Sequence, residues 1–390
     1  MKAEAMKQTK YPLLPYSQLV WDMMQTDKEV YTFRSRARIE KTAGRGERII
    51  EALRTAILNH PAFSMRVDEQ GMQYYERLND PLHGQFHDVD IEEKEYRIEL
   101  TLTLNRILGD GISTMVVIED FIRAYYGLPL EEDRYLEYLE QIEQNKQTER
   151  YLANKQWLEA RFDILKVPVH PATDFPLTTS ADWEEGLLTD DWSEYTDRLD
   201  NLQHSTLLPL TAIISLAAAM AIMDYNNTTE AALTWAYDGR ETPMTEHIVG
   251  SLHRDIPFAI SRNTTTTAQN DKEELSNLIK QASKEFRQGI AHSIYPYTLT
   301  PPHTEIWNYA VNVLEQTRPQ QFVEHMPFEI LTTDMQPNNK AYALLDIEIY
   351  SAPQLTIAYR YSATHYKLES IQHFAGLVKK NLLKLIYKNS

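Results

Sequence analysis

The segment Leu102–Ser113 (LTLNRILGDGIS) places an amide, a cation and a carboxylate close together in the sequence. The guanidinium of Arg106 keeps its proton at neutral pH and offers only N–H donors, so it can bind a carboxylate, a phosphate or a developing oxyanion but cannot act as a general base. The amide of Asn105 cannot act as a base either. Asp110 and Gly111 follow a predicted strand, where an Asp-Gly pair favours a turn with a structural aspartate and a conformationally free glycine. The segment therefore favours anion recognition over proton transfer.

The strand before this segment decides where Arg106 points. Residues Arg97–Leu104 alternate apolar and polar side chains, which is typical of a strand with one buried face. If that strand continues regularly, Arg106 shares the face of Leu102 and Leu104 and points into a site. The alternative is an exposed arginine at the rim of that site.

Few other groups suit catalysis or metal binding. There is no cysteine, which excludes disulfides, zinc-thiolate sites and a thiol nucleophile. Among the 12 histidines, His83 and His87 have a metal-ligand spacing, but their Pro-, Gly- and Asp-rich surroundings disfavour a metal site. The sequence has no phosphate-binding loop and no G-x-S-x-G elbow. We therefore expect no metal and no resident cofactor.

The charge and hydropathy of the chain disfavour some classes of binding partner. Lys and Arg number 39 and Asp and Glu 56, a net charge of −17 that disfavours nonspecific binding to nucleic acid or to a membrane surface. The longest apolar run, Leu207–Met223, is interrupted by Pro209 and predicts a buried core helix rather than a membrane span. The first residues lack an apolar targeting stretch. We expect a cytoplasmic protein without nucleic-acid or membrane partners.

Predicted strands and amphipathic helices alternate along the chain, which indicates an α/β protein. The proline-rich stretch Val167–Thr179 (VPVHPATDFPLTT) is typical of an extended connector. We expect an N-terminal lobe over residues 1–166, a connector over 167–182 and a C-terminal lobe over 183–390. The predicted helices cover residues 47–59, 115–125, 131–162 (one helix or a pair), 207–225, 272–289 and 368–386, and the predicted strands 97–104, 231–237, 345–349 and 355–361.

Several motifs, in order along the chain, resemble those of the condensation domains of non-ribosomal peptide synthetases, within the chloramphenicol-acetyltransferase-like superfamily. Asp110 and Gly111 match the end of the family's His-His-x-x-x-Asp-Gly motif. The stretch His60–Phe63 resembles the family's arginine-histidine-proline-alanine-leucine-arginine turn, although Ser64 stands where the family has arginine and Arg66 follows two residues later. Further matches are Pro15, Tyr16, Ser17, Gln18, Trp21, Asp120, Tyr126, Gly127, Gly239, Arg240, Glu246, Gly250, Ile256 and Pro257.

The resemblance implies a fold and a working residue. The fold would be two chloramphenicol-acetyltransferase-like α/β lobes in a V-shaped pseudo-dimer with a central tunnel. Acyl groups carried on phosphopantetheine, on a carrier protein or as coenzyme A, would enter it from opposite faces. The family's working residue, the second motif histidine, aligns with Arg106, and the first histidine aligns with Asn105. A neutral imidazole can manage the proton of the acceptor near neutral pH, whereas Arg106 cannot.

Two classes of function follow from the arginine at the position of the family's second motif histidine. The first is a binding protein that lacks the usual histidine-dependent condensation and holds a carrier-bound substrate or a partner biosynthetic enzyme; some condensation-like recruitment domains also carry arginine at this position. The second is a stand-alone acyltransferase that forms an amide or ester from a carrier- or coenzyme A-bound thioester by a modified mechanism.

The resemblance to condensation domains and the chemistry of the side chains also assign roles to the candidate site residues. Substrate-binding candidates are Arg106, Arg240 and His253, and His253 is also the loop histidine considered as a substitute base. Structural candidates are Asp110, Gly111 and Arg66, with Asp110 paired to Arg66, Arg240 or Arg106. No catalytic residue is assigned among the motif positions Asn105, Arg106, Asp110 and Gly111. A basic docking face for an acidic carrier, with an ordinary solvated strand as the alternative, would comprise Arg34, Arg36, Arg38, Lys41, Arg45 and Arg48.

Overall fold

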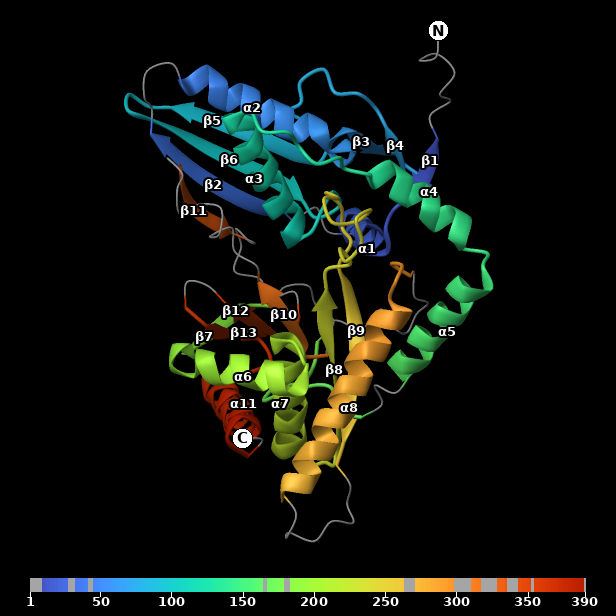
Figure 1. Ribbon diagram of the computed structural model, residues 1–390, viewed down its shortest axis with the longest axis vertical. Coiled ribbons are helices and arrows are strands. Elements are labelled where there is room, and N and C mark those ends of the chain that lie inside the picture. The colour runs from blue at the N-terminus through green and yellow to red at the C-terminus, as the bar shows by residue number, and fades with distance from the viewer. Residues whose placement is uncertain are drawn as a thin grey trace. The chain divides into compact units, whose positions relative to one another are not determined.

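The computed structural model divides the chain into two α/β units (Figure 1). The first unit comprises Met1–Thr148, Asp238–His253 and Arg318–Asn338, and the second comprises Glu149–Tyr237, Arg254–Thr317 and Asn339–Ser390. The structure describes residues 9–26, 32–40, 45–163, 167–178, 183–262, 271–297, 310–316, 328–334, 343–351 and 354–388.

These units are not contiguous in the sequence. Two segments from the second half of the chain, Asp238–His253 and Arg318–Asn338, belong to the first unit. Conversely, the second unit begins at Glu149, inside the predicted N-terminal lobe. The units therefore differ from the contiguous lobes expected from the sequence, because backbone pairing and side-chain contacts bring distant segments together. The described part of the predicted connector has no regular helix or strand. It belongs to the second unit, where the carbonyls of Pro168 and Val169 accept hydrogen bonds from the N–H groups of Ala232 and Val311.

The main sheet of the first unit is antiparallel, in the order β11-β2-β6-β5. Its central strand β6 (Arg97–Asn105) buries every second side chain, as its alternating sequence predicts. The apolar face of α2 (Arg45–Asn59) is buried, and the start of this helix at Gly46 lies against Ile98 of β6. The remaining elements of this layer are β2 (Thr32–Glu40), β5 (His87–Glu93), β11 (Phe328–Asp334) and α3 (Gly111–Tyr126).

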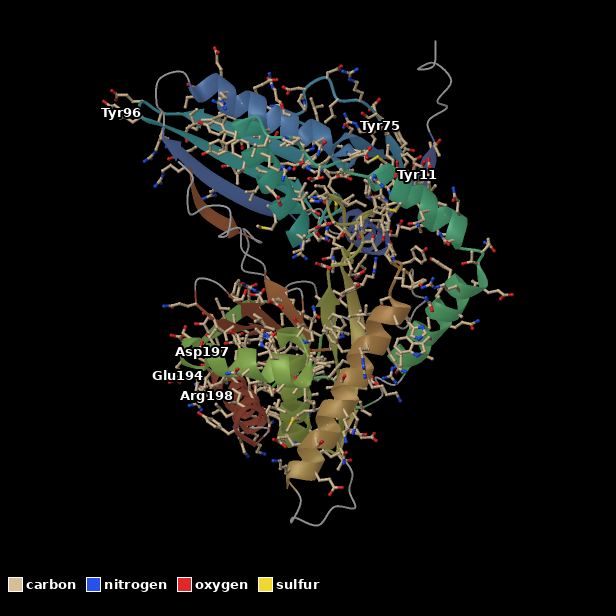
Figure 2. All side chains as sticks on the ribbon, in the orientation of Figure 1. Tyr11, Tyr75, Tyr96, Glu194, Asp197 and Arg198 are labelled. Atoms are coloured by element: carbon tan, nitrogen blue, oxygen red, sulfur yellow. The ribbon has the colours of Figure 1, made fainter. Side chains whose placement is uncertain are left out.

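A second, smaller sheet of the first unit has the order β1-β4-β3. It joins β1 (Lys10–Pro12) to the hairpin of β3 (Met65–Val67) and β4 (Met72–Tyr75). The hydroxyl of Tyr11, labelled in Figure 2, donates to Glu140 of α4 at 3.0 Å. Nearby elements are α1 (Pro15–Thr26), the 3-10 helix η1 (Pro61–Ser64) and α4 (Tyr135–Asn145).

The second unit is built on a six-stranded sheet in the order β7-β13-β12-β10-β8-β9. Strand β10 pairs parallel with β8 and β12, and the other pairs are antiparallel. Its strands are β7 (Glu185–Asp191), β8 (Glu230–Tyr237), β9 (Arg254–Ser261), β10 (Asn312–Gln316), β12 (Leu345–Tyr350) and β13 (Thr356–Ser362). Its helices are η2 (Ser193–Tyr195), α5 (Glu149–Asp163), α6 (Thr196–Thr206), α7 (Leu210–Asn226), α8 (Asp271–His292) and α11 (Leu368–Lys388).

Helix α7 forms the centre of the second unit's core. Every side chain from Leu210 to Met223 is buried, which confirms the predicted core helix. Helix α5 lies against the sheet through Tyr151 and Leu158, which pack with Ala232 of β8. The charged stretch 131–162 thus forms the helix pair α4 and α5. Among the described residues, no single helix is long and apolar enough to cross a membrane; Ser193–Thr206 and Leu210–Asn226 together meet the length and composition criteria, but the pair is bent by 96°.

Candidate functional site

The motif segment forms a tight turn between β6 and α3. Strand β6 ends at Asn105, and Arg106, Ile107 and Leu108 make the turn. The side chain of Asn105 is buried, and its Oδ1 accepts a hydrogen bond from the backbone N–H of Ile107 at 2.9 Å. The N–H of Leu108 donates to the carbonyl of Asn105 at 2.9 Å. The strand therefore does not continue to Arg106, so the orientation of this residue is set by the turn and not by strand alternation.

Arg106 is half-buried and anchored to the start of α1. Its Nη1 donates to the hydroxyl of Tyr16 at 2.7 Å. The neighbouring Ser17 fixes the same turn, because its Oγ donates to the carbonyl of Ile107 at 2.7 Å. The ring of Tyr16 packs edge-on against His253, with ring centroids 4.1 Å apart. Arg106, Tyr16 and His253, here called the Arg106 cluster, thus gather within the first unit.

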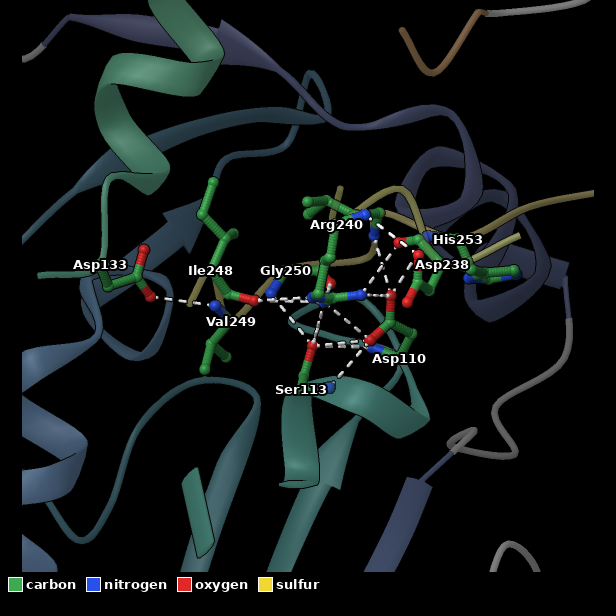
Figure 3. A network of polar contacts seen from close by, with 10 residues as sticks. Asp110, Ser113, Asp133, Asp238, Arg240, Ile248, Val249, Gly250 and His253 are labelled. Atoms are coloured by element: carbon green, nitrogen blue, oxygen red, sulfur yellow. Dashed lines mark hydrogen bonds and ion pairs between the residues drawn. The ribbon is translucent and has the colours of Figure 1, made fainter. Parts of the chain in front are cut away.

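Asp110 lies at the centre of a buried hydrogen-bond network (Figure 3). It caps α3, because its Oδ1 accepts from the N–H of Ser113 at 2.9 Å. The guanidinium of Arg240 donates to both carboxylate oxygens, at 2.9 and 3.0 Å. The N–H groups of Leu252 and His253 donate to Oδ2 at 3.0 and 3.2 Å. Burial opposes the charged form, but the Arg240 charge and these donors outweigh it and hold the pKa of Asp110 below its usual value.

The network decides between the arginines considered as partners of Asp110. Arg240 is the partner that the structure shows, whereas Arg66 bonds to Glu76 at 3.0 Å in a pair open to solvent. The pairing of Asp110 with Arg66 is therefore not found; Arg66 instead forms an exposed pair, a kind that contributes little to stability. Arg240 is 7% exposed and also donates to the carbonyls of Ile248 and Gly250. These bonds give Arg240 a structural place in the fold.

Gly111 does not need the conformational freedom of glycine. Among the described residues the glycines with positive φ are Gly71, Gly127 and Gly239. A Cβ at Gly111 would meet no other group within 4 Å. The expectation that Gly111 supplies backbone freedom to the turn is therefore wrong, because this residue is simply the first of α3.

A second buried charge cluster was not found by sequence reasoning. The Nδ1 of His60 lies 2.8 Å from Oδ2 of Asp133, and its Nε2 lies 3.3 Å from Oδ2 of Asp120. Burial lowers the pKa of His60, but the two carboxylates outweigh burial and raise it above its usual value. His60 and Asp120 belong to the quoted motif matches, whereas no spacing in the sequence connects Asp133 to them. Only the position of Asp133 just before α4 brings it to the imidazole.

The other candidates lie apart from these networks. His83 pairs with Asp88 at 2.5 Å on the surface, whereas His87 is buried and contacts the carbonyl of Pro81. No group of three metal-ligating side chains was found among the described residues. Of the basic set, Arg36 and Arg48 are exposed and Arg38 lies 3.7 Å from Glu99. Lys41 and the side chains of Arg34 and Arg45 lie outside the described residues.

The fold identifies the structural class to which this protein belongs. The chain has the chloramphenicol-acetyltransferase-like two-lobe fold, and solved structures of the same architecture cover nearly all of it. The epimerization domain from the third module of tyrocidine synthetase B matches with a TM-score of 0.73 and 17% identity, covering 97% of this chain and 98% of that one. The starter condensation domain of rhizomide synthetase, a variant in complex with C8-CoA, matches with a TM-score of 0.70 and 15% identity, covering 98% and 96%.

The family follows from the sequence itself. A sequence model of the condensation domain matches residues 91–390, and the chain belongs to the condensation-domain family. Surfactin synthase subunit 1 of Bacillus subtilis (strain 168) is 18% identical over 357 residues, which cover 83% of this chain. The chain spans 10% of that relative's length.

Proposed function

We propose that this condensation-domain-like protein binds an acyl group carried on phosphopantetheine, or the carrier protein that bears it, without carrying out histidine-dependent condensation. The observation that carries the proposal is the side chain of Arg106, which stands at the family's second motif histidine and is anchored by the Tyr16 hydroxyl at 2.7 Å. A guanidinium keeps its proton throughout the physiological range. It therefore binds an oxygen of the acyl group or the phosphopantetheine but does not deprotonate an acceptor amine or alcohol.

The anchored geometry supports binding over catalysis. The Tyr16 hydroxyl restricts the long Arg106 side chain before any ligand arrives, so less conformational entropy is lost on binding. The starter condensation domain of rhizomide synthetase was solved with C8-CoA, which supports an acyl thioester of this kind as a ligand of the fold. Whether the acyl carrier is a carrier protein or coenzyme A is decided by comparing the two as probes.

A stand-alone acyltransferase with a modified mechanism is the second candidate. The observation that favours it is His253, whose ring packs against Tyr16 in the Arg106 cluster. An imidazole there would supply the titratable group that Arg106 lacks. Formation of a covalent amide or ester product distinguishes this candidate from the binding proposal.

The binding proposal is tested with octanoyl-coenzyme A and an octanoyl-phosphopantetheinyl carrier protein as probes. Calorimetry or fluorescence anisotropy measures the dissociation constant for the native chain, for Arg106→Ala and for the control Arg54→Ala, which changes an exposed arginine of α2. A charge-assisted hydrogen bond contributes about 1.5–3 kcal/mol. We therefore expect Arg106→Ala to weaken binding by about 10- to 100-fold.

The control variant shows whether the loss of affinity is specific to Arg106, and the two probes show which acyl carrier is bound. Arg54→Ala should bind like the native chain, since its guanidinium lies on the exposed face of α2. Equal affinity of Arg106→Ala and the native chain for both probes contradicts the proposal. Tighter binding of the loaded carrier than of octanoyl-coenzyme A identifies the carrier protein as the source of the acyl group.

A further inference from the structure

The loop of residues 248–253 in the first unit is held by the Asp110–Arg240 network and, separately, by Asp133 (Figure 3). From one side, Arg240 donates to the carbonyls of Ile248 and Gly250, and Asp110 accepts from the N–H of His253. From the other side, Oδ2 of Asp133 accepts from the N–H of Val249 at 3.0 Å. The loop carries His253 of the Arg106 cluster, so both networks define where that histidine lies.

The second network contains a titratable group that the first lacks. The imidazole of His60 is 0% exposed, and the carboxylates of Asp120 on α3 and Asp133 before α4 are 4% and 0% exposed. These carboxylates are the ionisable groups that the structure shows facing the ring; the ring of Phe63 lies 6.2 Å away. Nδ1 hydrogen bonds to Asp133, whereas Nε2 lies within ion-pair distance of Asp120 without a hydrogen bond. When the ring is protonated, its charge compensates one of the two buried carboxylates.

The same carboxylates have neutral partners that stay in place when His60 loses its proton. The Nδ2 of Asn59 donates to Asp120 at 2.7 Å, and the N–H of Tyr135 donates to Oδ1 of Asp133 at 2.8 Å. A neutral ring keeps one N–H and no charge, so it can donate to only one acid at a time, and repulsion between the two buried carboxylates favours their separation. Asp133 is the acid that also holds the loop, through Val249.

We propose that His60 is a positioning residue: its bound proton keeps Asp133 in the orientation that accepts from Val249, and thereby fixes the loop 248–253 that carries His253. The inference goes beyond the proposed function, because it concerns the loop in the protein without any ligand. Loss of the proton as the pH rises loosens this loop. The carboxylates raise the pKa of His60, which places that release above the pH at which an ordinary histidine titrates.

Hydrogen exchange of the loop amides tests this proposal in the full chain. Protection factors, corrected for the intrinsic pH dependence of exchange, are measured for Val249 and Gly250 between about pH 6 and pH 9. In the native protein we expect protection at Val249 to fall by about tenfold or more as His60 titrates. In His60→Gln, protection should be low and independent of pH, because the amide cannot carry the charge.

The matched control is His83→Gln, which removes a histidine paired with Asp88 on the surface. It should keep the native profile of Val249, while the amides of β6 in the first unit report that this unit is folded in each variant. Native-like protection of Val249 in His60→Gln across the pH range overturns the proposal. If His60→Gln does not fold, the test uses the native chain alone. The proposal then requires that the NMR titration of the His60 ring and the loss of Val249 protection have the same midpoint. A ring that titrates without loss of Val249 protection overturns the proposal.

Discussion

The guanidinium of Arg240 holds both carboxylate oxygens of Asp110, at 2.9 and 3.0 Å, although the two residues are 130 positions apart in the sequence. The pair is buried, and it joins the start of α3 to the loop 248–253. The motif aspartate therefore has an architectural role in this chain that is independent of the residue at position 106.

Removing one member of this pair should be costly. Arg240→Met leaves the Asp110 carboxylate buried without its cation, and we expect a loss of about 3–5 kcal/mol in the free energy of unfolding. Asp110→Asn should cost a similar amount, and the double variant should cost less than the sum of the two. Urea unfolding measures all three. The control Arg66→Gln breaks the exposed pair with Glu76 and should change the free energy by about 1 kcal/mol at most. Additive losses in the double variant would contradict the direct coupling of Arg240 and Asp110.

The two glycines at the ends of α3 should respond in opposite directions to alanine. Gly127 ends the helix with φ of 69°, where alanine is strained, and Gly127→Ala should destabilise the protein by about 1 kcal/mol. Gly111 opens the helix, and the space that an alanine methyl group would occupy there is open, so Gly111→Ala should be neutral or stabilising by up to about 1 kcal/mol. The shift of the melting temperature measures both effects. A loss of stability in Gly111→Ala equal to that in Gly127→Ala would refute this interpretation of the turn.

The stability of the protein should depend on the charge of His60. Its pKa is raised in the folded state, so its contribution is fully present below about pH 6.5, the ordinary value, and is lost as the pH rises through the folded-state pKa. Urea midpoints measured from mildly acidic to mildly alkaline pH should therefore fall for the native chain relative to His60→Gln. Parallel profiles of the two proteins would show that the buried proton adds no stability.

The Tyr16 hydroxyl should contribute to ligand binding through Arg106. Tyr16→Phe keeps the ring that packs against His253 but removes the oxygen that accepts from Arg106. A neutral hydrogen-bond partner is worth about 0.5–1.5 kcal/mol, so the variant should bind octanoyl-phosphopantetheine probes about two- to tenfold more weakly. Calorimetry with the native chain as reference measures the change. Unchanged affinity in a folded Tyr16→Phe would mean that the anchored geometry of Arg106 does not matter for binding.

The sequence predicts the parts of the fold that depend on local periodicity. The alternation in Arg97–Leu104 and the long apolar run at Leu207–Met223 correspond to β6 and to the buried helix α7. Local periodicity cannot predict which distant segments pair, which is why the strand β11 and the loop Asp238–His253 appear in the first unit only in the structure. The family motifs are what identify the chain as a condensation domain.

The contacts around Asp110 and Arg106 are not visible in the sequence. The sequence singles out Arg106, Asp110, Arg240 and His253, but not which arginine holds the aspartate. The continuation of β6 to Arg106 was wrong because Asn105 bonds to the N–H of Ile107 and turns the chain. The His60 cluster was missed because burial, which makes two carboxylates and a histidine interact strongly, is not visible in residue spacing.

With a cation at position 106, the protein should bind an acyl carrier but not condense its acyl group. To measure this, the native chain is incubated with an octanoyl-phosphopantetheinyl carrier protein and a panel of amines and alcohols, and acyl transfer is followed by mass spectrometry. We expect no amide or ester above the background without protein, and none for Arg106→His, because the resemblance places Asn105 and Ser64 where the family has histidine and arginine. Transfer by the native chain that is lost in Arg106→Ala would contradict it.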